Sequence, residues 1–281
     1  FKPANSKDAD AKSTMLALFR GFEMMDATND FIIKEFSSYF KGQEKKAEAS
    51  QIAPKDYRGE IVKDNYYDFN DRFYGNPDVI PVTESTAIKP AESPYGATKQ
   101  MGEVVIKDFS KVANTNTILL RYFNPVGAHP SCLIGELPVG KPQNLVPAIT
   151  QTEIGKLPKM WVHGSDYPTK DGSCVRDYIH VSDIAHAHTL AIQYSIKNNQ
   201  PNSCEIFNLG TGNGITVLEA IHAFEKVSGE KLNYVIGPRR PGDVVKTWAD
   251  TAKINQVLGW YPKYSLEDSM RDSWNWQKSL K

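Results

Sequence analysis

One stretch of the chain, residues 117–123, restricts the fold more than any other. It reads Thr-Ile-Leu-Leu-Arg-Tyr-Phe, an almost unbroken apolar run. Such runs are typical of strands that are buried on both faces of a parallel sheet. Residues 204–209, Cys-Glu-Ile-Phe-Asn-Leu, form a second run of this kind. The sequence therefore predicts an α/β fold, in which ligands bind beyond the carboxyl ends of the strands.

Helical patterns alternate with these strands. A helix is expected to start at Pro94, and Thr216 is expected to cap another. The predicted helices after the first lie at about 144–155, 182–197, 216–227, 249–258 and 266–280. Short strands are predicted at 160–163 and 234–236, and a loop rich in Pro and Gly at 124–130. In the first part of the chain the patterns predict helices at 11–25 and 31–42, a charged linker at 43–55, and one strand candidate at 61–62.

The helix expected to start at Pro94 carries two residues that can act together chemically. Tyr95 and Lys99 are four positions apart and therefore share one face of a helix. A phenol beside an ammonium group can act as a base near neutral pH, because the cation favours the phenolate. Alone, the Tyr-x-x-x-Lys pattern is a weak signal, since it occurs by chance in many chains.

Charge and cysteine usage exclude several classes of protein. The 33 Lys and Arg balance 33 Asp and Glu, so there is no electrostatic case for binding nucleic acid or a membrane surface. No apolar run approaches a membrane span, and no signal peptide is evident. Cys132, Cys174 and Cys204 form no Cys-x-x-Cys pair, and the six histidines show no metal-ligand spacing. We therefore expect reduced thiols, a cytoplasmic location and no metal site.

Two further features are expected to be structural. Residues 210–214, Gly-Thr-Gly-Asn-Gly, follow a strand and precede a helix, as phosphate-binding loops do. Their spacing does not fit Gly-x-Gly-x-x-Gly, so we interpret them as a turn. His180 lies in a predicted strand, and we expect it to be packed and hydrogen-bonded.

Several longer motifs follow one another after residue 73. They are Tyr-Gly at 74–75, Ser-Pro-Tyr-Gly-x-x-Lys at 93–99, Arg-Tyr-Phe-Asn-Pro-x-Gly-Ala-His-Pro-Ser at 121–131, Asn-Leu at 144–145, Val-Arg-Asp-Tyr-Ile-His-Val at 175–181, Asn-Leu-Gly-Thr-Gly at 208–212, Pro-Arg-Arg-Pro-Gly-Asp at 238–243 and Trp-Ala-Asp at 248–250. In this order they resemble the UDP-glucose 4-epimerases of the extended short-chain dehydrogenase/reductase family. The resemblance implies a Rossmann-like fold interleaved with a smaller C-terminal UDP-sugar-binding domain over residues 74–281.

The resemblance assigns the chemistry to a few residues. Tyr95 would take the proton of the sugar 4-hydroxyl. Lys99 would bind the nicotinamide ribose of NAD and lower the tyrosine pKa, and Tyr122 would line the nicotinamide site. The family places Ser or Thr four residues before its Tyr-Gly pair. Here that position is Asn70, which can hydrogen-bond a sugar but cannot relay a proton as a hydroxyl does.

The resemblance also implies a site for the UDP-sugar. Its residues would be Phe123, Asn124, Asn144, Leu145, Arg176, Tyr178, Arg240, Asp243 and Thr247. Arg176 and Arg240 would hold the diphosphate, because guanidinium groups match phosphate oxygens. Asp243 would accept the uridine ribose hydroxyls. In the family, a tyrosine at the position of Thr247 excludes N-acetyl sugars and a small residue admits them, so we expect UDP-N-acetylglucosamine to fit as well.

The first 73 residues do not share this resemblance. A family member begins with a strand, a Gly-x-x-Gly-x-x-Gly turn and a helix that together bind the NAD pyrophosphate. Residues 1–73 contain only Gly21, Gly42 and Gly59. We interpret them as a helix-rich segment in which the nucleotide-binding units are missing or replaced. NAD is the cofactor that the family implies, but this chain is expected not to retain it through purification.

Three functions are compatible with these residues. In the first, the chain interconverts UDP-glucose and UDP-galactose by oxidation and reduction at sugar C4. In the second, it binds UDP-sugars without turnover because the NAD site is lost. In the third, it is a related dehydratase or decarboxylase, which the motifs at 144–145 and 239–243 disfavour. The expected partner is a UDP-sugar, and the family resemblance adds a homodimer.

Overall fold

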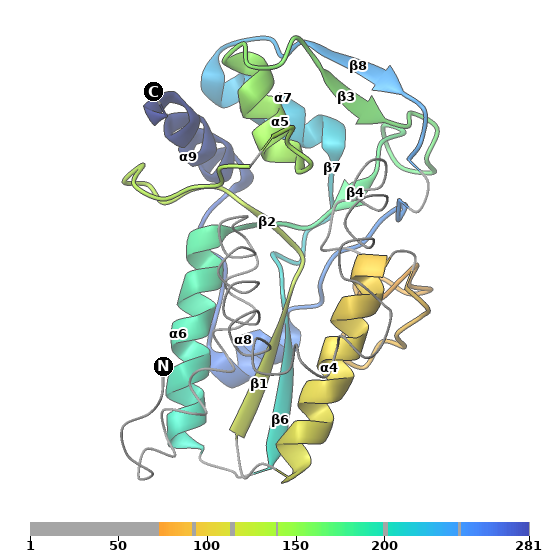
Figure 1. Ribbon diagram of the computed structural model, residues 1–281, viewed down its shortest axis with the longest axis vertical. Coiled ribbons are helices and arrows are strands. Elements are labelled where there is room, and N and C mark those ends of the chain that lie inside the picture. Colours follow the sequence, from red (N-terminus) through yellow and green to blue (C-terminus); the bar gives the residue numbers. More distant parts are fainter. Residues whose placement is uncertain are drawn as a thin grey trace, which may run out of the picture.

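The centre of the fold is a pair of parallel strands, as the two apolar runs predict. Strand β1 (Asn116–Tyr122) pairs with β6 (Ser203–Leu209), and Leu120 lies beside Phe207. Figure 1 shows this pair between helix α4 (Pro94–Val112) and helix α6 (Val181–Lys197), with α8 (Ala252–Leu258) behind it. Ile118 and Leu120 pack in one cluster with α6 and α8, whereas Arg121 points toward α4. We call this part the sheet half.

The computed structural model describes residues 73–91, 94–112, 116–138, 140–198, 202–240 and 243–280, with the backbone alone at 94 and 95. The predicted elements at 11–25, 31–42 and 61–62, and the linker at 43–55, lie outside these residues. Within the described ranges, no helix is long and apolar enough to cross a membrane.

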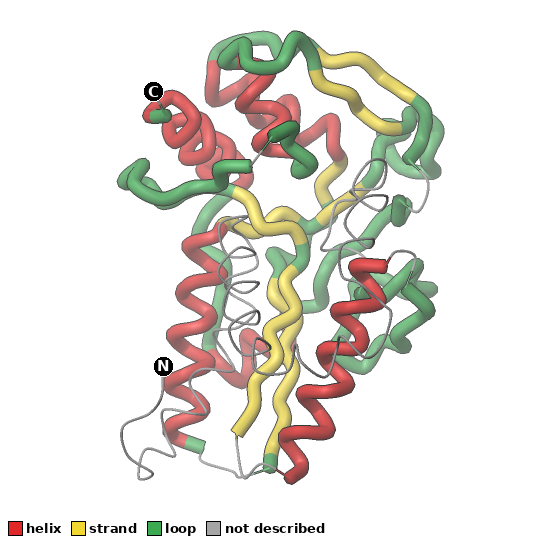
Figure 2. Tube along the Cα trace, viewed as in Figure 1, coloured by secondary structure: helices red, strands yellow, loops and turns green. Residues whose placement is uncertain are grey.

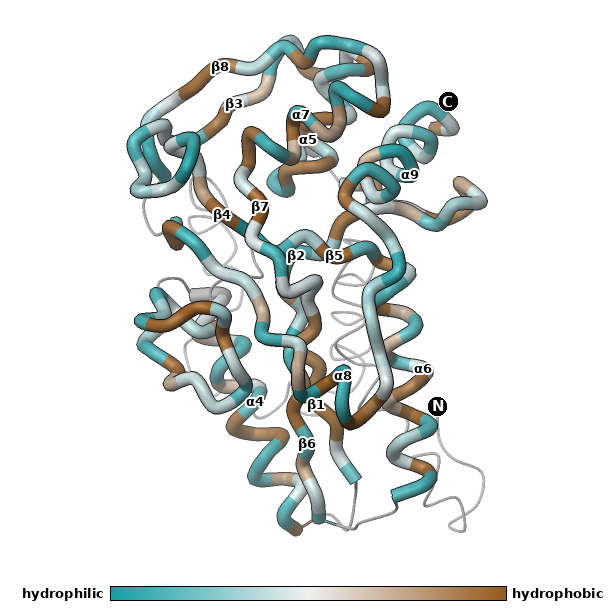
Figure 3. The backbone as a smooth tube through the Cα atoms, turned by 180° about the vertical axis from the view of Figure 1, so that it is seen from behind, coloured by the Kyte–Doolittle hydropathy of each residue, from teal (hydrophilic) through white to brown (hydrophobic). Residues whose placement is uncertain are grey.

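The second part, which we call the helical half, packs three helices beside two parallel strands. The helices are α5 (Leu145–Glu153), α7 (Val217–Ser228) and α9 (Leu266–Ser279). The strands are β3 (Met160–His163) and β8 (Tyr234–Gly237), whose hydrophobic residues are visible in Figure 3. Ile149, Phe224 and Met270 are fully buried in the shared core. Thr216 caps α7 together with Glu219 in a capping box, which confirms the predicted cap.

Short strands carry the chain between the two halves, and we call this region the joint. Strand β2 (Asn124–Val126) pairs in parallel with β5 (Tyr178–His180), and β4 (Val175–Arg176) pairs antiparallel with β7 (Ile215–Thr216). Figure 2 shows the two central strands leading toward these short ones. The chain passes through the joint repeatedly, after β1, before α6, after β6, before α8 and before α9. Each half is therefore assembled from segments that are far apart in the sequence.

Two predicted boundaries are wrong. Residues 124–126 are predicted to be loop, but they form β2, because pairing with β5 overrides the local Asn-Pro signal. The helix predicted from residue 249 begins at Ala252. Ala249 cannot join it, because its N–H donates to the Asp177 carboxylate (3.0 Å) and the residue forms a β-bridge with Val82.

Candidate functional site

Helix α4 presents the Tyr-x-x-x-Lys pair close to its N-terminus. The helix begins at Pro94, so Tyr95 and Lys99 lie about one turn apart, as predicted. Lys99 is half-buried. The side chain of Tyr95 and the whole of Asn70 lie outside the described residues, so the base and its neighbour stay predictions.

One turn beyond Lys99, a buried ion pair fastens α4 to the central strand. Glu103 accepts two hydrogen bonds from one edge of the Arg121 guanidinium, at 2.5 Å from Nη2 and 3.0 Å from Nε. Lys107 reaches the same carboxylate (2.7 Å) from the partly exposed side of the helix. Burial alone would raise the pKa of Glu103, but the bonds from Arg121 and Lys107 outweigh it and hold the pKa below its ordinary value.

The interpretation of the sequence missed this pair. Its signal was an arginine within an otherwise apolar strand, because a charge in such a place needs a buried partner. Arg121 also donates to the Tyr74 hydroxyl (2.6 Å), which in turn donates to Asn208 Oδ1 on β6 (2.6 Å). Burial raises the pKa of Tyr74 and exceeds the effect of Arg121. Tyr74 is therefore a protonated connector between β1, β6 and the segment before α4.

Tyr122, the last residue of β1, is hydrogen-bonded to a histidine of α6. The Tyr122 hydroxyl lies 2.8 Å from His188 Nε2, and His188 Nδ1 lies 2.9 Å from the Ile184 carbonyl. A carbonyl only accepts, so Nδ1 carries the proton and Nε2 accepts from the tyrosine. Burial lowers the pKa of His188, which favours this neutral form. The next residue, Phe123, packs in a buried cluster with Tyr74 and others, so its contact with a substrate stays a prediction.

Residues predicted to bind UDP-sugar meet at the joint. Asn124 of β2 stands opposite Tyr178 of β5 in the parallel register. Arg176 of β4 is buried and donates through Nη1 to the main-chain carbonyls of Val175 (3.0 Å) and Val244 (2.7 Å). The segment that contains Val244 therefore runs beside β4.

The same segment brings the remaining predicted residues to the joint. Thr247 is 1% exposed, and its N–H donates to the Val175 carbonyl (3.2 Å). Asp243 forms an ion pair with Arg240, with Nε and Oδ2 3.5 Å apart. The structure thus gathers the predicted substrate residues on β2, β4 and β5 with those after β8.

Two buried polar atoms of this group make no hydrogen bond. They are Asn124 Oδ1 and Arg240 Nε, and the latter has the longer ion-pair contact with Asp243. A buried donor or acceptor without a partner costs roughly 1–3 kcal/mol. A ligand with phosphate oxygens and hydroxyls can satisfy a guanidinium N–H and an amide oxygen. A ligand that carries both kinds of group could therefore satisfy these two atoms.

The last two predicted substrate residues, Asn144 and Leu145, lie at the start of α5. Asn144 is the N-cap residue of the helix, but its side chain makes no capping bond and donates to Glu136 instead (2.6 Å). Leu145 packs against the helical core, which also contains Tyr178.

The glycine turn after β6 is structural, as predicted. The Asp177 carboxylate fills it and accepts from Thr211 N (2.7 Å), Thr211 Oγ1 (2.6 Å) and Gly212 N (3.1 Å), as well as from Ala249 N. Its donors are therefore occupied by an internal anion, where a phosphate loop would leave them for a ligand. Burial raises the pKa of Asp177, although these bonds act in the opposite direction.

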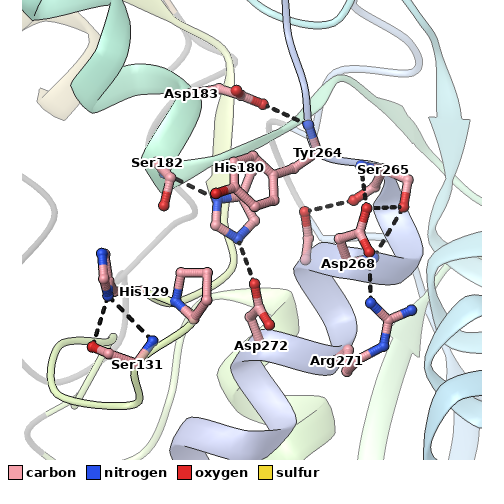
Figure 4. A network of polar contacts seen from close by, with 12 residues as sticks. His129, Ser131, His180, Ser182, Asp183, Tyr264, Ser265, Asp268, Arg271 and Asp272 are labelled. Atoms are coloured by element: carbon pink, nitrogen blue, oxygen red, sulfur yellow. Dashed lines mark hydrogen bonds and ion pairs between the residues drawn. The ribbon is translucent and has the colours of Figure 1, made fainter.

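His180 is packed and hydrogen-bonded, which confirms its predicted role (Figure 4). Its Nδ1 accepts from Ser182 N (3.0 Å) at the start of α6, so the ring proton sits on Nε2, 3.3 Å from Asp272 of α9. The ring also stacks on Tyr264, with centroids 4.1 Å apart. Gly127 lies so close that a Cβ there would be 2.5 Å from the ring, which explains glycine at this position. Burial lowers the pKa of His180 and favours the neutral ring.

The described residues that could hold NAD are Lys99 and Tyr122. Lys99 can donate to a ribose, and Tyr122 ends a central strand, where ligands of such sheets bind. Both suit the nicotinamide end of the cofactor alone. Within the described ranges, no three His, Cys, Asp or Glu side chains gather as a metal site, and Cys132, Cys174 and Cys204 are free.

Known proteins match the same part of the chain. A model of the GDP-mannose 4,6 dehydratase family matches residues 70–273. The UDP-glucose 4-epimerase of Yersinia enterocolitica is 49% identical over 206 residues, 73% of this chain and 60% of its own length. The crystal structure of the Bifidobacterium longum UDP-glucose 4-epimerase, in complex with NAD+ and UDP, is 41% identical with a TM-score of 0.70 and covers 75% of this chain and 62% of that one. The UDP-Glc/GlcNAc 4-epimerase from Campylobacter jejuni is 37% identical with a TM-score of 0.59, over 74% and 62% of the two chains.

The matched region spans about 60% of the length of these relatives. The family model covers more than half of the present chain, and the similarity lies in the residues from which the joint and the central strands are built. NAD is the family's cofactor, since solved relatives such as the epimerases of Bifidobacterium longum and Brucella ovis are described in complex with it. The chain belongs to the GDP-mannose 4,6 dehydratase family of Rossmann-like, extended short-chain dehydrogenase/reductase proteins, and the relatives described above are UDP-glucose 4-epimerases.

Proposed function

We propose that the chain binds a UDP-sugar at the joint and acts as a UDP-hexose 4-epimerase, interconverting UDP-glucose and UDP-galactose. One observation carries the proposal: most of the predicted substrate residues, although scattered from 124 to 247, lie around β2, β4 and β5, where two buried polar atoms make no hydrogen bond. The identity of 47–49% to named epimerases supports the same substrate class.

The roles of the residues follow from their chemistry. Arg176 and Arg240 neutralise the diphosphate, and Asn124 and Asn144 add hydrogen bonds. Asp243 accepts the ribose hydroxyls. Tyr95 takes and returns the proton of the 4-hydroxyl, with Lys99 favouring its ionised form and Asn70 bonding the sugar. NAD, when bound, supplies oxidation and reduction at C4, and Tyr122 stands beside its nicotinamide end.

The second candidate is a UDP-sugar-binding protein without turnover. The absence of a Gly-x-x-Gly-x-x-Gly motif from residues 1–73 favours it. Two measurements separate the candidates. UDP binding is measured by calorimetry, and conversion of UDP-galactose is measured by a coupled assay with added NAD. Binding with conversion supports the epimerase, binding alone supports the second candidate, and no binding refutes both.

Three finer features belong to the same proposal. Thr247 is small, so the site admits N-acetyl sugars, as the description of the Campylobacter jejuni relative suggests. Helix α4 carries exposed apolar residues along one side. They include Met101, Val105, Phe109 and Val112. A second copy of this chain would cover them in a twofold homodimer. The free cysteines suit a reducing, cytoplasmic environment.

A further inference from the structure

The loop after β2 supplies an acidic residue to the start of α5. Glu136 Oε1 lies 2.6 Å from the Asn144 amide nitrogen. Asparagine is a favoured N-cap because its oxygen accepts from the first helical N–H groups. Asn144 makes no such bond. Its amide is turned toward Glu136, so the position serves something other than capping.

Glu136 is itself fixed in place by α9. Its main-chain carbonyl accepts from Trp276 Nε1 (2.8 Å). The preceding residue, Gly135, lies against the Trp276 ring so closely that a Cβ would stand 2.4 Å from Cγ. Figure 2 shows this loop running beside α9. The backbone that carries the Glu136 carboxylate is therefore held against α9, within reach of Asn144.

We propose that Glu136 is a positioning residue for diphosphate recognition, an inference that rests on the proposed UDP-sugar site. An asparagine amide has two N–H groups. Glu136 engages one and thereby fixes the amide plane, which leaves the second N–H for a phosphate oxygen beside the first backbone N–H groups of α5. The arrangement orients Asn144 before the ligand arrives, so less rotamer freedom is lost on binding.

Glu136 could instead compete with the diphosphate for Asn144, and a Glu136 variant would then change UDP affinity in the opposite direction. If Glu136 occupied the N–H that the diphosphate needs, the two anions would compete. Removal of the carboxylate would then strengthen binding. The affinity of a Glu136 variant for UDP therefore separates positioning from competition.

The experiment measures the Kd of UDP by calorimetry for the full chain, four variants at positions 136 and 144, and one control variant. Glu136→Ala should weaken binding about three- to tenfold, the size of one lost hydrogen bond. Glu136→Gln keeps the acceptor oxygen and should stay within about twofold of the parent. Asn144→Ala should be as weak as Glu136→Ala, and the double variant no weaker than Asn144→Ala, because the two residues act through one contact.

Glu267→Ala serves as the matched control, since Glu267 pairs with Lys226 at the protein surface and should leave UDP affinity unchanged. Thermal unfolding of each variant identifies any loss of fold, and Glu136→Gln keeps the test informative if the alanine variant unfolds. Tighter or equal binding by Glu136→Ala, or an added loss in the Asn144→Ala background, would overturn the assignment alone. Failure of the parent chain to bind UDP would refute the proposed function and the assignment together.

Discussion

The ion pair between Glu103 and Arg121 allows a quantitative prediction, because one carboxylate meets two cations in different surroundings. The Arg121 side chain is 4% exposed, and that of Lys107 is 37% exposed. Replacing Arg121 by Met leaves the Glu103 carboxylate buried with only Lys107 as its charged partner. Replacing Lys107 by Met leaves the buried pair intact.

Breaking a buried pair by removal of one partner costs about 3–5 kcal/mol, whereas a partly exposed pair contributes about 0–1 kcal/mol. For a protein of this size, 1 kcal/mol corresponds to roughly 2–4 °C in Tm. We therefore expect Arg121→Met to lower Tm by about 6–20 °C and Lys107→Met by at most about 4 °C. The double variant Glu103→Leu with Arg121→Met should recover much of the loss, since an apolar pair needs no charge compensation.

The assay is thermal and urea unfolding followed by circular dichroism, at neutral and at acid pH. The Glu103 pKa is lowered in the folded state, so the pair stabilises fully above the unfolded pKa and loses its effect as pH falls through the folded pKa. Arg121→Met should therefore lose less stability on acidification than the parent. Equal losses of Tm in the Arg121 and Lys107 variants, or an Arg121 variant as stable as the parent, would refute the reasoning.

Three further predictions concern the proposed chemistry. Tyr95→Phe should lower conversion of UDP-galactose at least about 10²-fold while the calorimetric Kd of UDP stays unchanged, and near-normal turnover would contradict its role as base. Thr247→Tyr should abolish binding of UDP-N-acetylglucosamine and spare UDP-glucose, whereas loss of both would point to a folding defect. The denatured protein should release no stoichiometric NAD, because Lys99 and Tyr122 alone suit one end of the cofactor and contribute about 2–4 kcal/mol before ligand immobilisation. Stoichiometric NAD in the supernatant would contradict that expectation.

The sequence predicted the central strands well, because continuous apolar runs leave few alternatives. It also predicted the helix of Tyr95 and the cap at Thr216, since both depend on local chemistry. It failed at residues 124–126 and at the start of α8, where partners more than fifty residues away decide the conformation. Local patterns contain no information about such partners.

The candidate site shows the same difference between what local sequence patterns predict and what distant partners decide. Motifs located most of the candidate residues, and the structure brings many of them to the joint. The residues that support them were missed, because Glu103 and Glu136 look like ordinary surface glutamates until Arg121 and Asn144 lie beside them. Pairings of this kind follow from the fold rather than from spacing along the chain.

The repeated passage of the chain through the joint has a topological consequence. A protein whose halves are joined by one linker falls into two pieces when that linker is cut. Here the chain passes between the sheet half and the helical half several times, at β2, before α6, after β6 and on both sides of α8. A cut in any one of them therefore leaves both halves built from segments of both fragments, so that packing and not a single peptide bond is expected to hold the arginines, Asp243 and Asn124 together.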